Sequence, residues 1–305
     1  MKKVLVTGAS GFIGKHILPH LLGAGFEVHG TYFQHSLESL PKGKGMNWHK
    51  VNLLDRAGTD AVLEKIKATH LLHLAWYAEP GRFWDAPQNF DWLQASSGLL
   101  RAFAKNGGKR FVGAGTCAEY DWKDGKLNES SSLIKPATLY GSCKSNFLKY
   151  AEPFCKENNV SCAWGRLFWL YGPGEDERRI VPSVITSLLS GEEAQCTESN
   201  QKRDFMHVGD AARALAALLA SDKEGAFNIA SGQAVTLKDL ISHIGKLVDK
   251  ESLLKFGAKE TPPGEAPLVV ADISRLYHEL NFRSEMNLDT GLRETISWWQ
   301  RKIFS

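Results

Sequence analysis

The stretch Val4-Leu5-Val6-Thr7-Gly8-Ala9-Ser10-Gly11-Phe12-Ile13-Gly14 decides the fold of this chain. An aliphatic run typical of a buried parallel strand leads into three evenly spaced glycines. Gly8 permits a tight turn, Gly11 lets a pyrophosphate approach the backbone, and Gly14 lets the next helix pack closely on the strand. The N–H groups that open this helix attract an anion. Because a strand precedes the glycines and a helix follows them, we predict a dinucleotide-binding turn rather than a ligand-free one.

Composition narrows the class of protein. The chain has 305 residues, is 43% hydrophobic and carries a formal charge of +3 from 37 basic and 34 acidic residues. A chain of this kind can bury a large core, and it lacks the basic footprint of a nucleic-acid-binding protein and any apolar run of membrane-spanning length. The start Met1-Lys2-Lys3 is not expected to be a signal peptide, since a strand follows at once. The five cysteines lack ligand spacing, so we expect reduced thiols, no metal site and a cytoplasmic location.

The first half of the chain alternates apolar runs with helical patterns, which is typical of βαβ units. Right-handed crossovers would wind these units into a doubly wound parallel sheet of the Rossmann type, with helices on both faces. After the first strand, further strands are predicted at 27–33, 46–51, 70–75, 110–114 and 162–167, with helices that include 60–67 and 92–105.

The character of the sequence changes at Tyr171-Gly172-Pro173-Gly174. We predict a nucleotide-binding domain over 1–170 and a smaller substrate-binding lobe over most of 171–305, with segments near 206–230 returning to the first domain. The second part is expected to hold loops, a helix near 181–189, and two helices after the proline-rich stretch 262–267.

Tyr140 and Lys144 are four residues apart, so they share one face of a helix. A lysine cation beside a phenol favours the phenolate, and we therefore expect a lowered pKa that suits Tyr140 to acid–base catalysis. Lys144 can also hold a cofactor ribose. Thr116 follows an apolar strand and should lie at the carboxyl edge of the sheet, where it can orient a substrate oxygen or simply cap a turn.

With these motifs the sequence resembles the extended short-chain dehydrogenase/reductases that act on nucleotide sugars. The resemblance spans nearly the whole chain, and further motifs that carry it are His73-Leu74-Ala75, Arg203-Asp204-Phe205-Met206-His207-Val208, Asn228-Ile229-Ala230-Ser231-Gly232 and Ala271-Asp272-Ile273-Ser274. It implies Thr116, Tyr140 and Lys144 as the catalytic triad and a homodimer as the assembly. It also implies that Arg203 binds the substrate diphosphate, although an ion pair with Asp204 or Asp210 is the alternative. The residues predicted to contact the cofactor are Gly8, Ser10, Gly11, Phe12, Ile13, Gly14, Tyr32, Asn52, Leu53, Leu74, Ala75, Tyr140 and Lys144.

Departures from the family pattern reduce the number of reactions that the enzyme is expected to catalyse. Sugar-nucleotide dehydratases carry an acidic pair directly after the threonine, where this chain has Cys117 and Ala118. The epimerases that act at two neighbouring carbons use a cysteine and a histidine, and Gly174 stands where that histidine would be needed. Hydride transfer at one carbon remains, either as reduction of a keto-sugar or as a 4-epimerisation.

An aromatic segment over 76–84 follows the fourth strand and should lie beside the mouth of the site. Its rings could stack on a sugar or a base, or they could close the interface between the lobes. We predict substrate contacts from Trp76, Arg82, Thr116, Trp169 and Arg203.

The second strand ends without the acidic residue that would bind the ribose of NAD, and Tyr32 stands in its place. His35, Lys42 and Lys44 could lie near a 2′-phosphate. NADP is therefore slightly favoured, with NAD possible. We predict an NAD(P)-dependent reductase of a nucleotide-linked 4-keto-6-deoxy sugar. The alternatives are a 4-epimerase with tightly bound NAD and a non-catalytic NAD(P)-binding sensor.

Overall fold

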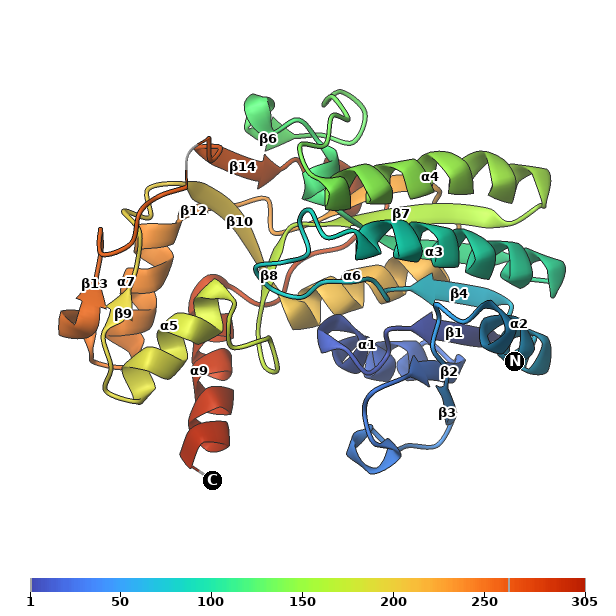
Figure 1. The fold of residues 1–305 in the computed structure, drawn as a ribbon, viewed down its shortest axis with the longest axis horizontal. Helices are drawn as coiled ribbons and strands as arrows, with labels where there is room; N and C mark the ends of the chain where they lie inside the picture. The colour runs from blue at the N-terminus through green and yellow to red at the C-terminus, as the bar shows by residue number, and fades with distance from the viewer. Residues whose placement is uncertain (1, 263, 305) are drawn as a thin grey trace.

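Seven parallel strands form one sheet in the computed structural model of the protein, which describes residues 2–262 and 264–304 (Figure 1). In spatial order they are β11 (Gly225–Ile229), β7 (Ser161–Leu167), β5 (Arg110–Thr116), β4 (His70–His73), β1 (Lys3–Thr7), β2 (Glu27–Tyr32) and β3 (Met46–Lys50). The strand order reverses at β1, which pairs with β2 on one side and β4 on the other. Ligands of such sheets bind outside the carboxyl ends of the strands at this reversal.

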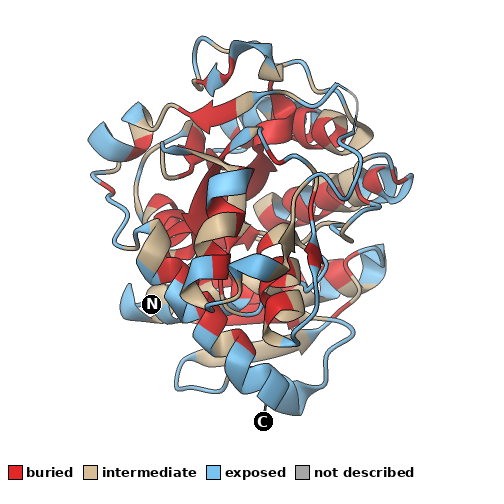
Figure 2. Cartoon of the chain, turned by 90° about the vertical axis from the view of Figure 1, so that its left-hand side faces the viewer, coloured by how far each residue is buried: buried red, intermediate tan, exposed pale blue. Residues whose placement is uncertain are grey.

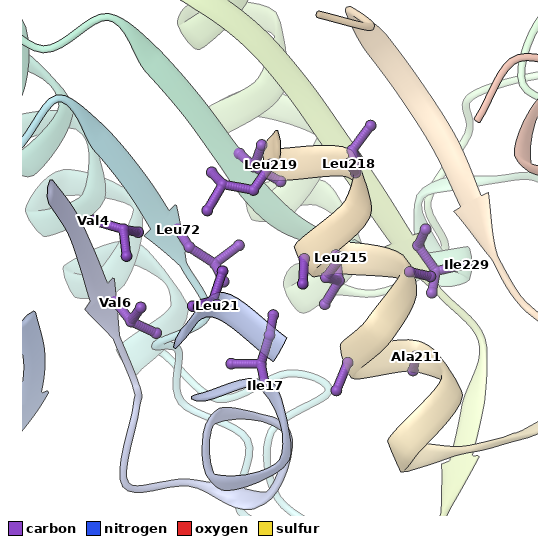
Figure 3. Close-up of a cluster of buried hydrophobic side chains, with 14 of the residues drawn as sticks. Val4, Val6, Ile17, Leu21, Leu72, Ala211, Leu215, Leu218, Leu219 and Ile229 are labelled. Atoms are coloured by element: carbon purple, nitrogen blue, oxygen red, sulfur yellow. The ribbon is translucent and has the colours of Figure 1, made fainter. Parts of the chain in front are cut away.

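Helices cover both faces of the sheet. One face carries α1 (Phe12–Gly23) and α6 (Val208–Ala220), and the other carries α2 (Arg56–Ile66), α3 (Gln88–Lys105) and α4 (Leu139–Glu157). On the first face, Ile17 and Leu21 of α1 and Leu215 of α6 gather over the strand residues Val6 and Leu72 (Figure 3). This packing of aliphatic side chains keeps α1, and so the glycine turn before it, fixed against the sheet. Buried residues accordingly fill the middle of the molecule, whereas the end of the last helix is exposed (Figure 2).

The predicted doubly wound sheet is confirmed, with small shifts at the ends of elements. The strand expected at 70–75 ends at His73, and β5 runs on to Thr116. The α2 helix begins at Arg56 rather than at residue 60, because the Asp55 side chain accepts the Ala57 N–H at 3.1 Å and caps the helix earlier. The α3 helix likewise begins four residues before its predicted start.

The second lobe contains a sheet that the sequence analysis missed. Its strands are β12 (Ala234–Thr236), β10 (Lys202–His207), β14 (Leu268–Ala271) and β6 (Lys126–Leu127), with β8 (Trp169–Tyr171) also paired to β10. Strands of two to six residues with distant partners leave little periodic signal, and β6 comes from the first half of the chain. Loops do connect these strands, as predicted, but the sheet itself was not predicted.

Helices α5 (Ile180–Leu189), α7 (Leu237–Leu247) and α9 (Leu288–Phe304) share one core beside this sheet. The α7 helix was not predicted, and the short strands β9 (Ala194–Gln195) and β13 (Leu254–Lys255) pair next to it. The short helix α8 (Ser274–His278) packs on β11, which pairs with β7, so this late part of the chain joins the main sheet.

All five cysteines are buried and none forms a disulfide. Over residues 2–262 and 264–304, no helix is both long enough and apolar enough to cross a membrane.

Candidate active site

The glycine turn after β1 forms an open cradle, and side chains in place of its glycines would clash with the surrounding backbone. Gly8 has φ +70°, and a Cβ there would lie 2.8 Å from the Ala75 nitrogen at the end of β4. A Cβ on Gly14 would overlap the Gly8 carbonyl, so α1 crosses directly over the turn. No side chain caps the first turn of α1, which leaves its N–H groups available to an anion. These residues fit a dinucleotide pyrophosphate.

Tyr32 is the last residue of β2, at the position expected for a residue that contacts the ribose of a dinucleotide. Its carbonyl accepts the Val51 N–H at 2.9 Å, which places Asn52 and Leu53 next to it. The Tyr32 ring meets Trp48 edge-on at 6.2 Å. The basic residues that follow β2, His35, Lys42 and Lys44, are exposed.

Thr116 ends β5 and caps the 3-10 turn Cys117–Glu119. Its hydroxyl accepts the Ala118 N–H at 3.2 Å, while its own N–H donates to Glu119 Oε1 at 2.9 Å. The two bonds form a capping box, so the capping role considered from the sequence is present. The cap uses the Thr116 hydroxyl only as an acceptor, so the cap does not engage the hydroxyl proton.

Tyr140 and Lys144 lie in the first turns of α4, which Thr138 caps by accepting the Gly141 N–H at 3.1 Å. Lys144 is 3% exposed, and its Nζ donates to the Ala114 carbonyl at 2.7 Å. The same Nζ lies 5.9 Å from the centre of the Tyr140 ring. The pair that the sequence predicted is thus placed beside the carboxyl end of β5.

The electrostatics of this pair differ from the prediction. Burial raises the pKa of Tyr140 above its ordinary value, and an interaction with the Thr116 hydroxyl only partly opposes this. Burial also lowers the pKa of Lys144 to about 7, against a small raising effect of Glu119. The sequence predicted that a lysine cation lowers the pKa of the Tyr140 phenol. This prediction was wrong, because desolvation of the phenol outweighs the attraction between the two groups.

The aromatic segment after β4 packs on Tyr140 and Lys144. The Phe83 ring meets Tyr140 edge-on at 4.9 Å, and the Trp84 carbonyl accepts the Tyr140 N–H at 2.8 Å. Trp76 lies with its ring centre 4.0 Å from Lys144 Nζ. Arg82 points away, with its side chain 75% exposed and 3.7 Å from Glu79. These rings therefore support Tyr140 and Lys144, a role that the sequence analysis did not consider.

A cavity of about 620 Å³ opens next to this cluster. Trp84, Ala118 and Thr138 line its catalytic side, and Trp122 and Ala266 belong to its second-lobe side. Cys117 faces elsewhere, in a core with Phe168 and Ala230. The site therefore has no acidic side chain directly after Thr116.

Arg203 of β10 does not pair with Asp204 or Asp210. Its guanidinium donates to Glu265 at 3.0 Å and to the Ala266 carbonyl at 2.8 Å, and it is 2% exposed. The guanidinium also lies 5.2 Å from the Trp169 ring. The guanidinium of Arg203, which was predicted to bind phosphate, is thus already paired with the carboxylate of Glu265.

Arg275 of α8 lies away from this cavity. It pairs with Glu279 at 2.7 Å and lines a different cavity of about 460 Å³ together with Glu152.

Two histidines form structural hydrogen bonds beside the site. His73 is bonded to Thr7 at 2.6 Å and to Ser96 at 2.8 Å, and burial lowers its pKa to about 3. His207 caps α6 by accepting the Gly209 N–H at 3.3 Å.

The site also depends on a buried ion pair that the sequence analysis did not identify. Glu119, which bonds the Thr116 N–H, lies 2.8 Å from Arg166 of β7, and both side chains are at most 5% exposed. Arg166 in turn donates to the Tyr120 hydroxyl at 2.9 Å. The signal that could have found it is a glutamate three residues after a strand-ending threonine, which is the capping-box spacing.

The chain belongs to the NAD dependent epimerase/dehydratase family, whose model matches residues 4–230. The solved structure of UDP-N-acetylglucosamine 4-epimerase from Methanobrevibacter ruminantium M1 is 26% identical with a TM-score of 0.88, and the match covers 99% of both chains. MoeE5 in complex with UDP-glucuronic acid and NAD is 28% identical with a TM-score of 0.85, covering 98% of this chain and 99% of that one.

Among curated proteins, the dTDP-4-dehydro-6-deoxyglucose reductase of Escherichia coli is 25% identical over 96% of both chains. An uncharacterized UDP-glucose epimerase of Bacillus subtilis, YtcB, is 27% identical over 97% of both chains. These relatives are nucleotide-sugar epimerases and reductases, which confirms the resemblance and the assignment of this chain to an enzyme family.

Proposed function

We propose that this protein reduces the 4-keto group of a nucleotide-linked 4-keto-6-deoxy sugar. The observation that carries the proposal is the cluster of Thr116, Tyr140 and Lys144 beside the glycine cradle, with Cys117 turned into the core and Ala118 at the cavity wall. This arrangement supports proton and hydride transfer at one carbon. The two positions after Thr116, where the dehydratases carry their acidic pair, are Cys117 and Ala118.

The three residues have distinct roles in this reaction. A bound reduced nicotinamide supplies the hydride. Tyr140 donates its proton to the keto oxygen, and its raised pKa keeps that proton in place until negative charge develops on the oxygen. Thr116 donates a hydrogen bond to the same oxygen and orients it. Lys144 binds the cofactor ribose and stabilises the phenolate that Tyr140 leaves behind.

The nucleotide end of the substrate is expected at Arg203 and Trp169. A guanidinium suits paired phosphate oxygens, and an indole face can stack on a sugar or a base. Trp76 packs against Lys144, so we no longer expect it to contact the substrate. The exposed side chain of Arg82 would have to leave Glu79 to make its predicted substrate contact.

For the cofactor we favour NADP slightly over NAD, because Tyr32 replaces the acid that would repel a 2′-phosphate. MoeE5 was solved with NAD, so NAD is the alternative. Titration of the protein with NADPH and NADH tests this choice, and tighter binding of NADH would reverse it.

A 4-epimerase with tightly bound NAD is the second candidate. It is supported by the match to the Methanobrevibacter ruminantium epimerase, which covers 99% of both chains. Reduced-nicotinamide absorbance separates the two. A reductase consumes reduced cofactor in step with product, whereas an epimerase needs none added. A protein that binds the cofactor and turns over no sugar would be the sensor considered from the sequence.

We also propose a homodimer that forms through α3 and α4. The Phe90 side chain on α3 is 59% exposed and Tyr150 on α4 is 36% exposed, which leaves apolar surface on the outer side of both helices. Analytical ultracentrifugation of the wild type and of Phe90→Lys tests this assembly, and a monomeric wild type would contradict it.

A further inference from the structure

Asn89, the second residue of α3, joins the two parts of the aromatic segment. Its side chain is fully buried. Its Oδ1 accepts the indole N–H of Trp76 at 2.8 Å, and its Nδ2 donates to the carbonyls of Phe83 at 2.8 Å and Ala86 at 2.9 Å. Chemistry fixes the orientation of the amide, because an indole N–H only donates and a carbonyl oxygen only accepts.

The first of these bonds orients the ring over the catalytic lysine. The centre of the Trp76 ring lies 4.0 Å from Lys144 Nζ, and Trp92 and Phe147 lie 6.4 and 6.5 Å from the indole. A cation is attracted to an aromatic face, most strongly where water is excluded, as it is around buried Lys144. The orientation of the indole therefore affects where the ammonium lies and how readily it keeps its proton.

The second set of bonds fixes the turn that contacts the catalytic tyrosine. Phe83, whose carbonyl Asn89 binds, meets the Tyr140 ring edge-on at 4.9 Å. The carbonyl of the next residue, Trp84, accepts the Tyr140 N–H at 2.8 Å. One amide thus supports the neighbours of both members of the catalytic pair.

We propose that Asn89 is a positioning residue of the hydride-transfer site, holding Trp76 over Lys144 and Phe83 against Tyr140. This inference rests on the proposed function, since it assigns Asn89 to the same site. Removal of the amide would leave the Trp76 indole N–H and the Phe83 carbonyl without these partners, whereas the Ala86 carbonyl keeps the backbone N–H of Asn89 at 3.1 Å. We expect both aromatic residues to move to satisfy the lost bonds.

Few other charged groups act on Lys144. Glu119 is the carboxylate that raises its pKa, and that carboxylate is bound to Arg166 at 2.8 Å. His73 lies close enough for Lys144 to lower its pKa and, with a pKa of about 3, stays neutral at physiological pH. Tyr140 is the remaining titratable neighbour, and its pKa is raised. A titration near neutral pH that Lys144→Met abolishes therefore reports Lys144.

The first experiment measures cofactor affinity as a function of pH, using the fluorescence of NADPH and NADH. Because protonated Lys144 binds the ribose, affinity should fall as pH rises through a midpoint of about 7 in the wild type, and Lys144→Met should abolish this dependence. Asn89→Leu should lower the midpoint by roughly half to one unit, since the cation loses its aromatic face. An unchanged midpoint in Asn89→Leu would overturn the proposal.

The second experiment is a double-mutant cycle on kcat with Trp76→Phe, which keeps a ring and removes the indole N–H. Asn89→Leu should reduce kcat about 10-fold with little change in the sugar KM, as expected for misplaced catalytic groups. If Asn89 acts on Lys144 through Trp76, the fold decrease in kcat of the double variant should be smaller than the product of the fold decreases of the two single variants. Independent, multiplicative losses would contradict this coupling.

Phe103→Leu is the matched control, because Phe103 is a fully buried residue of the same helix and belongs to the core behind it. It should lower the Tm without moving the pH midpoint. If the wild type reduces no keto-sugar, the proposed function fails, while the pH dependence of cofactor binding still decides whether Asn89 positions Lys144.

Discussion

The carboxylate of Glu119 lies 2.8 Å from the guanidinium of Arg166, and the same carboxylate accepts the N–H of Thr116 at 2.9 Å. The Trp164 indole donates to it as well, at 2.9 Å. Thr116 is thus fixed to β7 through a buried ion pair. Its position depends on two charged side chains that are almost fully buried.

Replacing Glu119 by Gln should leave the Arg166 charge buried without a counter-ion. We expect the free energy of unfolding to fall by about 3–5 kcal/mol, measured by denaturant titration. Glu279→Gln is the control, since it breaks a partly exposed pair with Arg275 and should cost about 1 kcal/mol or less. Equal losses in the two variants would contradict a structural role for the buried pair.

Tyr140→Phe should lower turnover by about 10²- to 10⁴-fold, because the keto oxygen loses its proton donor. Affinity for the cofactor should change little, since the glycine cradle and Lys144 remain. The exposed Tyr150 on the same helix provides the control variant Tyr150→Phe, which should keep wild-type turnover. Steady-state kinetics of both variants test this, and an active Tyr140→Phe enzyme would refute the mechanism.

Lys144 should make stability depend on pH. Burial lowers its pKa in the folded protein to about 7, below the ordinary lysine value of 10.5. Between these values the unfolded chain binds more protons, so the contribution of Lys144 to stability rises with pH. Lys144→Met removes this term, and its stability relative to wild type should fall by roughly 2–3 kcal/mol between about pH 7 and pH 9.5. A constant difference across this range would contradict a lowered lysine pKa.

We expect Glu265, which lies 3.0 Å from Arg203, to compete with substrate phosphate for that guanidinium. In Glu265→Gln the guanidinium loses its carboxylate partner, and the KM for a nucleotide sugar should fall about 3- to 10-fold. Glu260→Gln, an exposed change in the same part of the chain, should leave KM unchanged. A higher KM in Glu265→Gln would show that the carboxylate supports substrate binding.

The sequence predicted the part of the site that depends on local patterns. The glycine spacing after β1 and the four-residue spacing of Tyr140 and Lys144 each act within one strand, turn or helix. The contacts of Glu119 with Arg166 and of Asn89 with Trp76 join elements that are distant in the chain or depend on the exact path of a loop. The direction of the Lys144 pKa shift was missed for the same reason, because it follows from burial that only the packed structure reveals.

The most direct test of the central claim is to incubate the protein with a nucleotide-linked 4-keto-6-deoxy sugar and NADPH or NADH deuterated at the transferable position. We predict that reduced-nicotinamide absorbance falls by one equivalent per product molecule and that the deuterium appears at C4 of the sugar. Interconversion of 4-epimeric nucleotide sugars with no consumption of reduced cofactor would contradict the reductase assignment and identify the protein as an epimerase.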